Sequence, residues 1–408
     1  MKQQTNDGLG KIIEQGLEKM SEVGKWQKRF LLTLFNTALL LQGKVNFSSL
    51  GRHSALNEKT YRRWFRREFD FETFNLNCIE QGIRSEMVAA MDASHIPKRG
   101  KQTFGLGKFY SGCLGKAVKG LEISEIALIE RSSRQAFAFS TKQTVEDQAK
   151  TSVQLYADHL ESSASKLPEQ VKYLLLDGFY SKKDFIDRAC SLERNLELIG
   201  KLRCDANLKY LYQGSYSGFG RPKRFDGKVD FEDLSRFSSE GEKHKDLHLY
   251  SKTVWHVGLK RNLKVVLLVN TSNTKPRYIV LFSTDLFLSA AEILELYKLR
   301  FQIEFLFRDA KQFTGLCDCQ ARDENALDFH FNMAMTALNL AKLDLLQQHD
   351  PKQDFVFSLR SYIHKNFSHR LLNRLLSNLD LDLTCSKVKY AFLHALHFGL
   401  DSSYNCPE

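Results

Sequence analysis

The sequence has few prolines and no paired cysteine motif. Six of its 408 residues are proline and 26% are charged, a composition that argues against extensive disorder. Its eight cysteines are scattered, without a Cys-x-x-Cys pair or a local group of cysteine and histidine, so a zinc site is not expected. Cys317 and Cys319 form the only close pair, and we interpret them as reduced thiols in a reducing compartment.

The sequence also lacks a hydrophobic run of the length that a bilayer requires. Its longest apolar stretch, Phe30 to Leu41, is short and is interrupted by polar residues. The first fifteen residues have no apolar centre and do not resemble a signal peptide. These absences predict a soluble, cytoplasmic protein that does not bind a membrane.

Positive charge is the main bias of the composition. Lysine and arginine outnumber aspartate and glutamate by 59 to 48, which gives a net charge of +11 and a pI near 9.1. Such a balance favours a polyanionic partner, most often nucleic acid, although a merely basic soluble protein is the other interpretation of charge alone. The length predicts two or three structural units rather than one.

The first 80 residues are predicted to be helical and to contain a helix-turn-helix. Asn46 is placed to cap a short helix that ends near His53, and Asn57 is placed to cap a second helix over residues 58–68. The second helix is basic. Its cationic residues are Lys59, Arg62, Arg63, Arg66 and Arg67. A row of arginines on a short helix fits the DNA major groove, whereas the plainer interpretation is a solvated basic face on a three-helix unit.

The order of elements changes after residue 86. Three predicted strands are followed by a helix, a strand, a helix and a strand, which indicates an α/β unit around a mixed five-stranded sheet. We therefore divide the chain into a helical DNA-binding domain, a first part of the catalytic core, a β-rich insertion, a second part of the core, and a helical C-terminal region. The corresponding residues are 1–80, 81–203, 204–288, 289–350 and 351–408.

One predicted helix carries an unusual polar stripe. In "YKLRFQIEFLFRDAK", Tyr297, Arg300, Glu304 and Lys311 fall within roughly 60° of one another on a continuous α-helix, opposite a flank of leucine, isoleucine and phenylalanine. We expect the apolar flank to pack on the sheet and the stripe to face outward. A solvated stripe with an Arg300–Glu304 pair worth about 0.3–0.5 kcal/mol is the simpler alternative.

Two aspartates at predicted strand ends strengthen the functional interpretation of this stripe. Asp92 ends the first strand and Asp177 ends the fourth. Groups that act on ligands cluster at the carboxyl ends of strands in open α/β sheets, so both carboxylates can meet Glu304 if these strands are neighbours. Three carboxylates suit two Mg²⁺ or Mn²⁺ ions, which would activate the attacking oxygen and stabilise the departing one in phosphoryl transfer.

The stripe fits the pattern Y-x2-R-x3-E-x6-K and resembles the signature of the bacterial DDE insertion-sequence transposases of the IS-four group. "MDAS" around Asp92 and "LLLDGFYS" around Asp177 are similar to the two aspartate motifs of that group, and the similarity of organisation spans about residues 86 to 345. The sequence has Phe301 after the arginine, where relatives often have tryptophan. The resemblance implies an RNase H-like core, preceded by an all-α helix-turn-helix domain, interrupted by the β-rich insertion and followed by helices.

The resemblance also implies the activity and its residues. Asp92, Asp177 and Glu304 would bind two Mg²⁺ (or Mn²⁺) ions, and Tyr297, Arg300 and Lys311 would contact DNA. The reaction would be cleavage at the ends of the element and transfer of the 3′-hydroxyl into target DNA by a homodimer at the bacterial nucleoid. Two alternatives remain: a catalytically inactive, domesticated DNA-binding protein, and an RNase H-like nuclease without strand transfer.

Three further regions are candidate DNA contacts. The glycine-rich segment after Asp92 contains Lys98, Arg99 and Lys101 and no acidic residue up to Gly120, although a solvated β-hairpin has the same composition. The family implies a DNA hairpin intermediate with a flipped base stacked on an aromatic residue of the insertion, for which Trp255 is the candidate; a core tryptophan is an equal alternative. Arg221 in "GRPKR" is a weaker candidate for a minor-groove contact.

Overall fold

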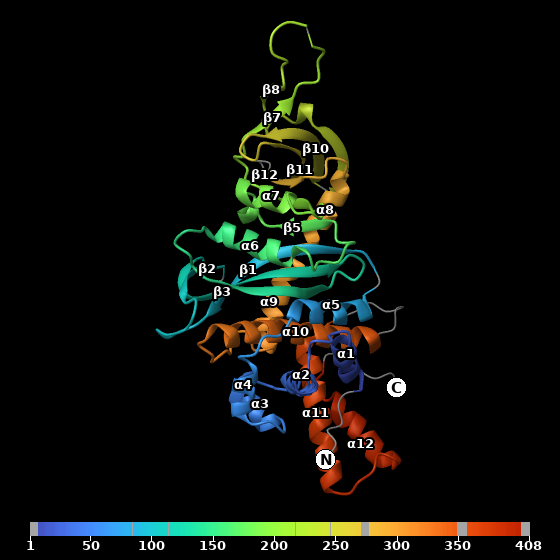
Figure 1. The fold of residues 1–408 in the computed structure, drawn as a ribbon. Coiled ribbons are helices and arrows are strands. Elements are labelled where there is room, and N and C mark those ends of the chain that lie inside the picture. Colours follow the sequence, from blue (N-terminus) through green and yellow to red (C-terminus); the bar gives the residue numbers. More distant parts are fainter. Residues whose placement is uncertain are drawn as a thin grey trace.

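The computed structural model describes residues 7–400, except 84, 113, 217, 245, 271–276 and 349–356. The molecule is elongated, with a sheet in the middle, the β-rich insertion at one end and helices of both chain ends at the other (Figure 1). The six cysteines that lie in the described part are free thiols. None of the helices placed by the structure is both long and apolar enough to cross a bilayer.

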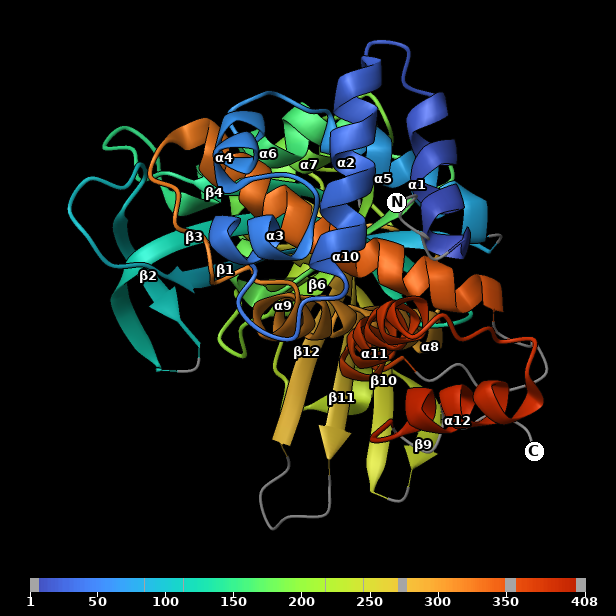
Figure 2. The same cartoon turned by 90° about the horizontal axis from the view of Figure 1, so that it is seen from below.

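The N-terminal region consists of short helices that pack beneath the sheet (Figures 1 and 2). Their bounds are α1 Asp7–Glu18, α2 Lys25–Ala38, α3 Phe47–His53, α4 Glu58–Trp64 and α5 Phe71–Gly82. Asn46 and Asn57 cap α3 and α4 as predicted, because each side chain accepts the backbone N–H three residues ahead. The predicted length of α4 is wrong: it ends at Trp64, where Phe65 turns into the core.

The predicted mixed five-stranded sheet is present. Its strands are β1 Met87–Pro97, β3 Lys116–Glu130, β4 Ala136–Thr144, β5 Tyr173–Leu176 and β6 Glu197–Leu202. Their order is β4-β3-β1-β5-β6, with β1 antiparallel to β3 and parallel to β5. The four residues of β5 are all buried, as a strand covered on both faces requires. A short strand, β2 Gly107–Ser111, extends the sheet beside β3.

Two helices connect the central strands. They are α6 Ser152–Ala164 and α7 Lys183–Cys190, with a 3₁₀ turn, η1 Gly178–Tyr180, before the second. Ser181, with Asp184 three residues on, predicts the cap of α7, but the structure has Lys182 at that position. The Ser181 hydroxyl instead donates to the backbone carbonyl of Lys201 at 2.8 Å, which ties the end of β5 to β6.

Residues 248–259, 262–270 and 277–284 alternate between apolar and polar or run apolar, which predicts a three-stranded meander. The insertion is larger than this meander and continues the core sheet. Its strands are β7 Leu208–Leu211, β8 Phe225–Lys228, β9 Ser238–His244, β10 Leu247–His256, β11 Arg261–Asn270 and β12 Arg277–Ser283, with η2 Leu234–Arg236 between β8 and β9. The meander itself is confirmed as β10, β11 and β12. Because β12 pairs with β6, the described strands form one twelve-stranded sheet.

The single helix predicted to begin at Ala290 is broken in the structure. The C-terminal helices are α8 Ala290–Leu299, α9 Gln302–Phe313, α10 Glu324–Gln348, α11 Leu359–Asn378 and α12 Ser386–His397. Between α8 and α9, the amides of Arg300 and Phe301 bond to carbonyls three residues back rather than four. This tighter turn changes the angles between side chains before and after it, so the predicted straight stripe is wrong.

The outer edge of β4 is covered by side chains rather than by another strand. Asn339 of α10 accepts from the Ala138 amide and donates to the Ala138 carbonyl, both at 2.7 Å. Asn332, Lys342 and Asn75 donate to three further carbonyls of β4. These contacts satisfy backbone groups that would otherwise be buried without partners, and they fix α10 against the sheet.

Replacing Asn339 with leucine should lower the free energy of unfolding by roughly 2–4 kcal/mol, because two buried backbone groups of Ala138 lose their partner. Urea unfolding measures the difference, and Gln347→Leu on the exposed face of the same helix is the control. A loss no larger than that of the control would show that these hydrogen bonds do not hold α10 in place.

Candidate active site

The register of two neighbouring strands brings Asp92 and Asp177 together. Met91 of β1 pairs with Leu176 of β5, the last residue of that strand. The next residues along the two parallel strands are Asp92 and Asp177. Adjacent strands lie about 4.8 Å apart, so the two acidic residues lie side by side on the sheet. The first and fourth predicted strands, β1 and β5, are therefore neighbours in the sheet. The prediction that Asp92 ends the first strand is wrong, because β1 continues to Pro97; only Asp177 follows the end of its strand.

Arg300 connects the strand carboxylates to the helix carboxylate. Its guanidinium nitrogens lie 2.9 Å from Oε1 of Glu304 and 4.0 Å from Oδ2 of Asp92. Only 5% of Arg300 is exposed, whereas half of the Glu304 side chain and a quarter of the Asp92 side chain are open to solvent. The expectation that the stripe faces outward is thus wrong for Arg300, which fills the space between two carboxylates.

Burial and the nearby carboxylates both raise the pKa of Asp92. Desolvation raises the pKa of Asp92 to about 6, and the carboxylates of Asp177 and Glu304 add to the rise. The Ala93 amide, which donates to Oδ1 at 2.8 Å, and the Arg300 guanidinium oppose it. The rise is mainly a cost of burying the charged carboxylate, and a cation bound beside Asp92 would offset that cost.

The other residues of the Tyr-Arg-Glu-Lys pattern lie near Arg300 and the strand that carries Asp92. Tyr297 is buried, not outward-facing as predicted, with its ring centroid 5.7 Å from the guanidinium carbon of Arg300. Phe301 stacks closer, at 4.5 Å, and is 45% exposed. Lys311 donates to the hydroxyl of Ser94 at 2.7 Å, two residues beyond Asp92 on β1. Ser94 was not singled out from the sequence, because only the fold shows that it meets Lys311.

The oxygen donors are of the type that binds Mg²⁺ or Mn²⁺. Carboxylates are hard ligands, and Asp92 lies in a centre with excess negative charge. In the arrangement described here, however, no three His, Cys, Asp or Glu side chains of the described chain are grouped as metal ligands. Arg300 lies between Asp92 and Glu304. A bound cation would therefore have to displace the guanidinium of Arg300 or bind beside it.

A basic cleft lies between the helices α3 and α4 and the central sheet. Its volume is about 630 Å³, and its lining joins α4, the segment after β1 and the segment before α10. The cationic lining residues are Arg62, Arg66, Lys98, Arg99 and Arg322. The cleft is continuous with β1, the strand that carries Asp92. Arg322 was missed in the sequence because only the fold brings it beside α4.

Some of the residues predicted to contact DNA are already bonded within the protein, and others are exposed to solvent. Lys98 is half-buried and donates to the backbone carbonyls of Cys319 and Ala321, so it holds a loop in place rather than projecting toward solvent. Two arginines of α4 and its end are exposed but engaged. Arg62 pairs with Glu58 at 2.6 Å, and Arg66 with Asp323 at 3.4 Å. The remaining cations, which are exposed, are Lys59, Arg63, Arg67, Arg99 and Lys101.

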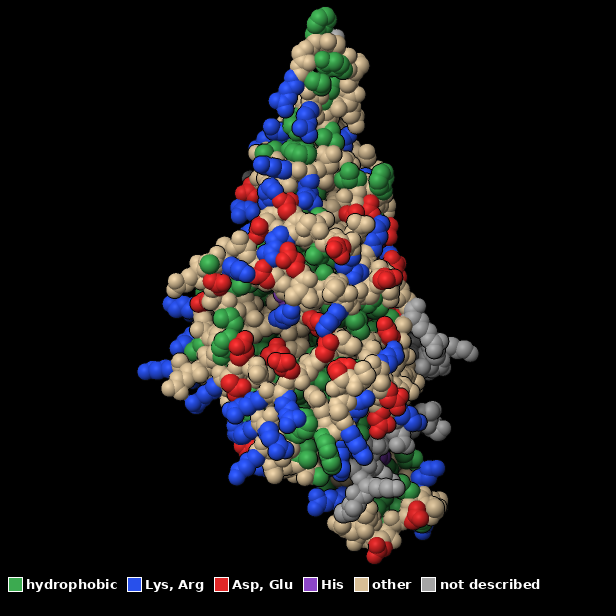
Figure 3. Space-filling model, in the orientation of Figure 1, with side chains coloured by type: hydrophobic (Ala, Val, Ile, Leu, Met, Phe, Trp, Pro, Cys, Tyr) green, Lys and Arg blue, Asp and Glu red, His purple; other side chains and the backbone are tan. Residues whose placement is uncertain are grey.

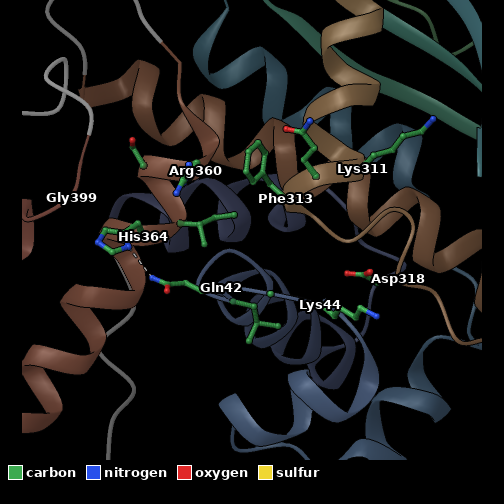
Figure 4. A pocket seen from close by; sticks show the side chains of 13 residues that line it. Gln42, Lys44, Lys311, Phe313, Asp318, Arg360, His364 and Gly399 are labelled. Carbon is green, nitrogen blue, oxygen red and sulfur yellow. Dashed lines mark hydrogen bonds between the residues drawn. The ribbon is translucent and has the colours of Figure 1, made fainter. Parts of the chain in front are cut away.

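A second cavity of about 650 Å³ extends from the other side of Lys311 (Figure 4). Its lining comes from the loop after α2, the end of α9 and the start of α11. Lys44 and Arg360 add positive charge, and Gln42 shares a 3.0 Å hydrogen bond with His364. Asp318 accepts from the Val45 amide and so fixes the loop after α2 to the end of α9.

Comparison with known proteins identifies the family. The model of a family described as "Transposase DDE domain" matches residues 84–340, which include Asp92, Asp177 and Glu304. The chain belongs to this transposase family. A piggyBac transposase in a synaptic complex with hairpin DNA, solved by cryo-EM, is similar at a TM-score of 0.45 and 11% identity, over 99% of this chain and 85% of that one. No curated protein sequence gives a significant match.

Trp255 of this transposase is half-buried on β10, not part of the closed core. Its ring centroid lies 5.6 Å from that of Phe225, and the guanidinium of Arg224 lies 5.5 Å from both rings. The indole therefore belongs to an aromatic and basic cluster at the surface of the insertion.

Replacing Arg300 with methionine should raise the pKa of Asp92 from about 6. The rise is expected because a nearby opposite charge lowers a carboxyl pKa by about 1–3, and the variant removes that charge. A ¹³C-carboxyl titration in the presence of a chelator measures this pKa. Arg308→Met, which removes a half-exposed arginine of α9 that pairs with Asp309, is the control and should leave Asp92 unchanged. An unchanged Asp92 in the Arg300 variant would refute the proposed charge balance.

Proposed function

We propose that this transposase belongs to the IS-four-like group with the Y-R-E-K signature. It would cleave DNA at the ends of an insertion sequence and join the freed 3′-hydroxyl to target DNA, in cut-and-paste transposition. The observation that carries the proposal is the pairing of Met91 with Leu176, which sets Asp92 beside Asp177, together with Arg300, which links Asp92 to Glu304.

Asp92, Asp177 and Glu304 are the proposed ligands of two Mg²⁺ or Mn²⁺ ions. When bound, such ions supply Lewis-acid stabilisation of charge on the phosphate oxygens. The protein's own contribution is to keep the carboxylates close together in a partly buried setting. Arg300 would balance their charge before the DNA arrives, and it is placed to bind a phosphate oxygen by its planar guanidinium afterwards.

Tyr297 and Lys311 have separate proposed roles. Tyr297 would position Arg300, because its buried ring packs beside the guanidinium. Lys311 would hold a phosphate next to the reacting one, since its ammonium already lies beside Ser94, two residues from Asp92. Both groups would align the scissile phosphate and leave the proton transfers to solvent and the carboxylates.

The basic cleft gives a path for the transposon end. Residues 1–80 would form the end-binding domain, with α4 on the duplex and the cleft guiding the backbone from Arg62 and Arg66 past Arg99 to Asp92. Residues 81–203 and 289–350 would form the catalytic core, 204–288 the insertion and 351–408 a C-terminal region. Trp255 would stack on a flipped base, for which its partial exposure leaves room. A homodimer would hold the two ends.

Three substitutions test the catalytic assignment: Asp92→Asn, Asp177→Asn and Glu304→Gln. Each should lower cleavage of end DNA in Mg²⁺ roughly 100- to 1000-fold or more, because it removes a charged group that acts on the transition state. DNA affinity should change little. Asp184→Asn, an exposed aspartate of α7, is the control. Retained cleavage in one variant removes that residue from the active site. Cleavage without joining by the wild type would favour the nuclease alternative.

Arg62→Ala combined with Arg66→Ala tests the path through the cleft. The double variant should bind end DNA more weakly, and the slope of log affinity against log salt should fall by about 1.8 if both arginines contact phosphates. Filter binding at several salt concentrations measures the slope. Lys11→Ala on α1 with Lys19→Ala directly after it removes the same charge as a control, because α1 lies on the other side of α2 from α4 (Figure 2). Equal slopes for the two double variants would contradict the path.

A further inference from the structure

A finger-like loop projects from the insertion at the end of the molecule opposite the helices (Figure 1). We define the finger as residues 212–216 and 218–224, between β7 and β8. Its base is closed by a 3.0 Å hydrogen bond from the Tyr212 amide to the Arg224 carbonyl. The lysine ammonium of Lys223 lies 4.7 Å from the centre of the Tyr212 ring, which further braces the base. The base of the finger is therefore held by specific contacts.

The apex of the finger presents an aromatic ring to solvent. Phe219 is 89% exposed and lies between Gly218 and Gly220, whose φ angles of +82° and +75° allow a sharp reversal of the chain. Tyr216 is 56% exposed, and its hydroxyl donates to the Gly220 carbonyl at 2.7 Å, which holds the reversal. Side chains at such turns are usually small and polar, so a phenylalanine held here requires an explanation.

The charge of the finger identifies the chemistry of its partner. It contains three exposed cations, Arg221, Lys223 and Arg224, and no acidic residue. Figure 3 shows hydrophobic side chains at the outermost end of this projection and lysine or arginine side chains behind them. The cations continue into the aromatic cluster of Phe225 and Trp255 through Arg224. An apolar tip on a cationic stem matches DNA, whose phosphates flank a stack of apolar base faces.

We propose that the finger is a DNA wedge: Phe219 enters a base step of duplex DNA from the minor groove, while Arg221, Lys223 and Arg224 bind the flanking phosphates. Proteins that bend DNA use phenylalanine or leucine in this way, and the ring partly unstacks the step that it enters. The inference rests on the proposed function only in taking DNA as the partner. Because β7 and β8 lie away from β1 and α9 (Figure 1), the wedge contacts DNA outside the catalytic centre.

DNA unwinding tests the wedge without knowledge of the terminal repeats. A relaxed closed-circular plasmid is incubated with the full chain, a chelator that prevents cleavage, and a topoisomerase that needs no metal. The protein is then removed, and the linking number is read on a gel. Wild-type protein should leave negative supercoils in proportion to the amount bound. Phe219→Ala should lose most of this unwinding, while its plasmid affinity falls less than about tenfold because the three cations remain. Phe219→Trp should retain the unwinding.

Phe287→Ala is the matched control, because Phe287 is 98% exposed on the connection between β12 and α8. It should unwind the plasmid as the wild type does. If wild-type protein binds the plasmid without unwinding it, or if Phe219→Ala unwinds it equally, the wedge is wrong while the proposed transposase function stands. If the wild type does not bind DNA, the proposed function itself fails. Phe219-dependent sedimentation with phosphatidylglycerol vesicles, without DNA unwinding, would assign the finger to a membrane surface and overturn the wedge.

Discussion

The parallel pairing of β1 with β5 is the constraint on which the candidate site depends. It brings Asp92 and Asp177 side by side, where burial and like charge raise the pKa of Asp92 and favour a counter-charge. Arg300 supplies part of it from the connection between α8 and α9. The tight turn at this connection directs the guanidinium of Arg300 inward and leaves Phe301 outside, so the break in the helix and the charge balance of the site are linked.

The covering of β4 connects this centre to the rest of the molecule. Side chains of α10 satisfy the free edge of β4, and the segment that leads into α10 supplies the carbonyls that bind Lys98. The same segment carries Arg322 and Asp323, which face the arginines of α4 across the basic cleft. The helix α4 and the strand with Asp92 are thus held by one set of contacts.

Local signals in the sequence were sufficient for much of the fold. The caps of α3 and α4 depend on side chains within three residues, and the apolar run of β5 indicates a strand buried on both faces, so both could be predicted. The break at Arg300 could not, because the apolar and polar periodicity of residues 297–311 fits a continuous helix and the approach of Arg300 to Asp92 joins residues distant in sequence. The burial of Lys98 and the position of Arg322 also arise from contacts more than 200 residues apart. The extension of the sheet through β12 depends on pairing with β6, which no local pattern encodes.

The central claim is that Asp92, Asp177 and Glu304 share divalent cations on one face of the sheet. Anomalous scattering from crystals of the full chain grown with Mn²⁺ and an end duplex tests it most directly. The account predicts manganese peaks with carboxylate oxygens of Asp92 and Asp177 at about 2.0–2.4 Å, with Glu304 on the same pair of ions and Arg300 displaced toward phosphate. Manganese bound elsewhere, with the Asp92 and Asp177 carboxylates still facing Arg300 alone, would contradict it.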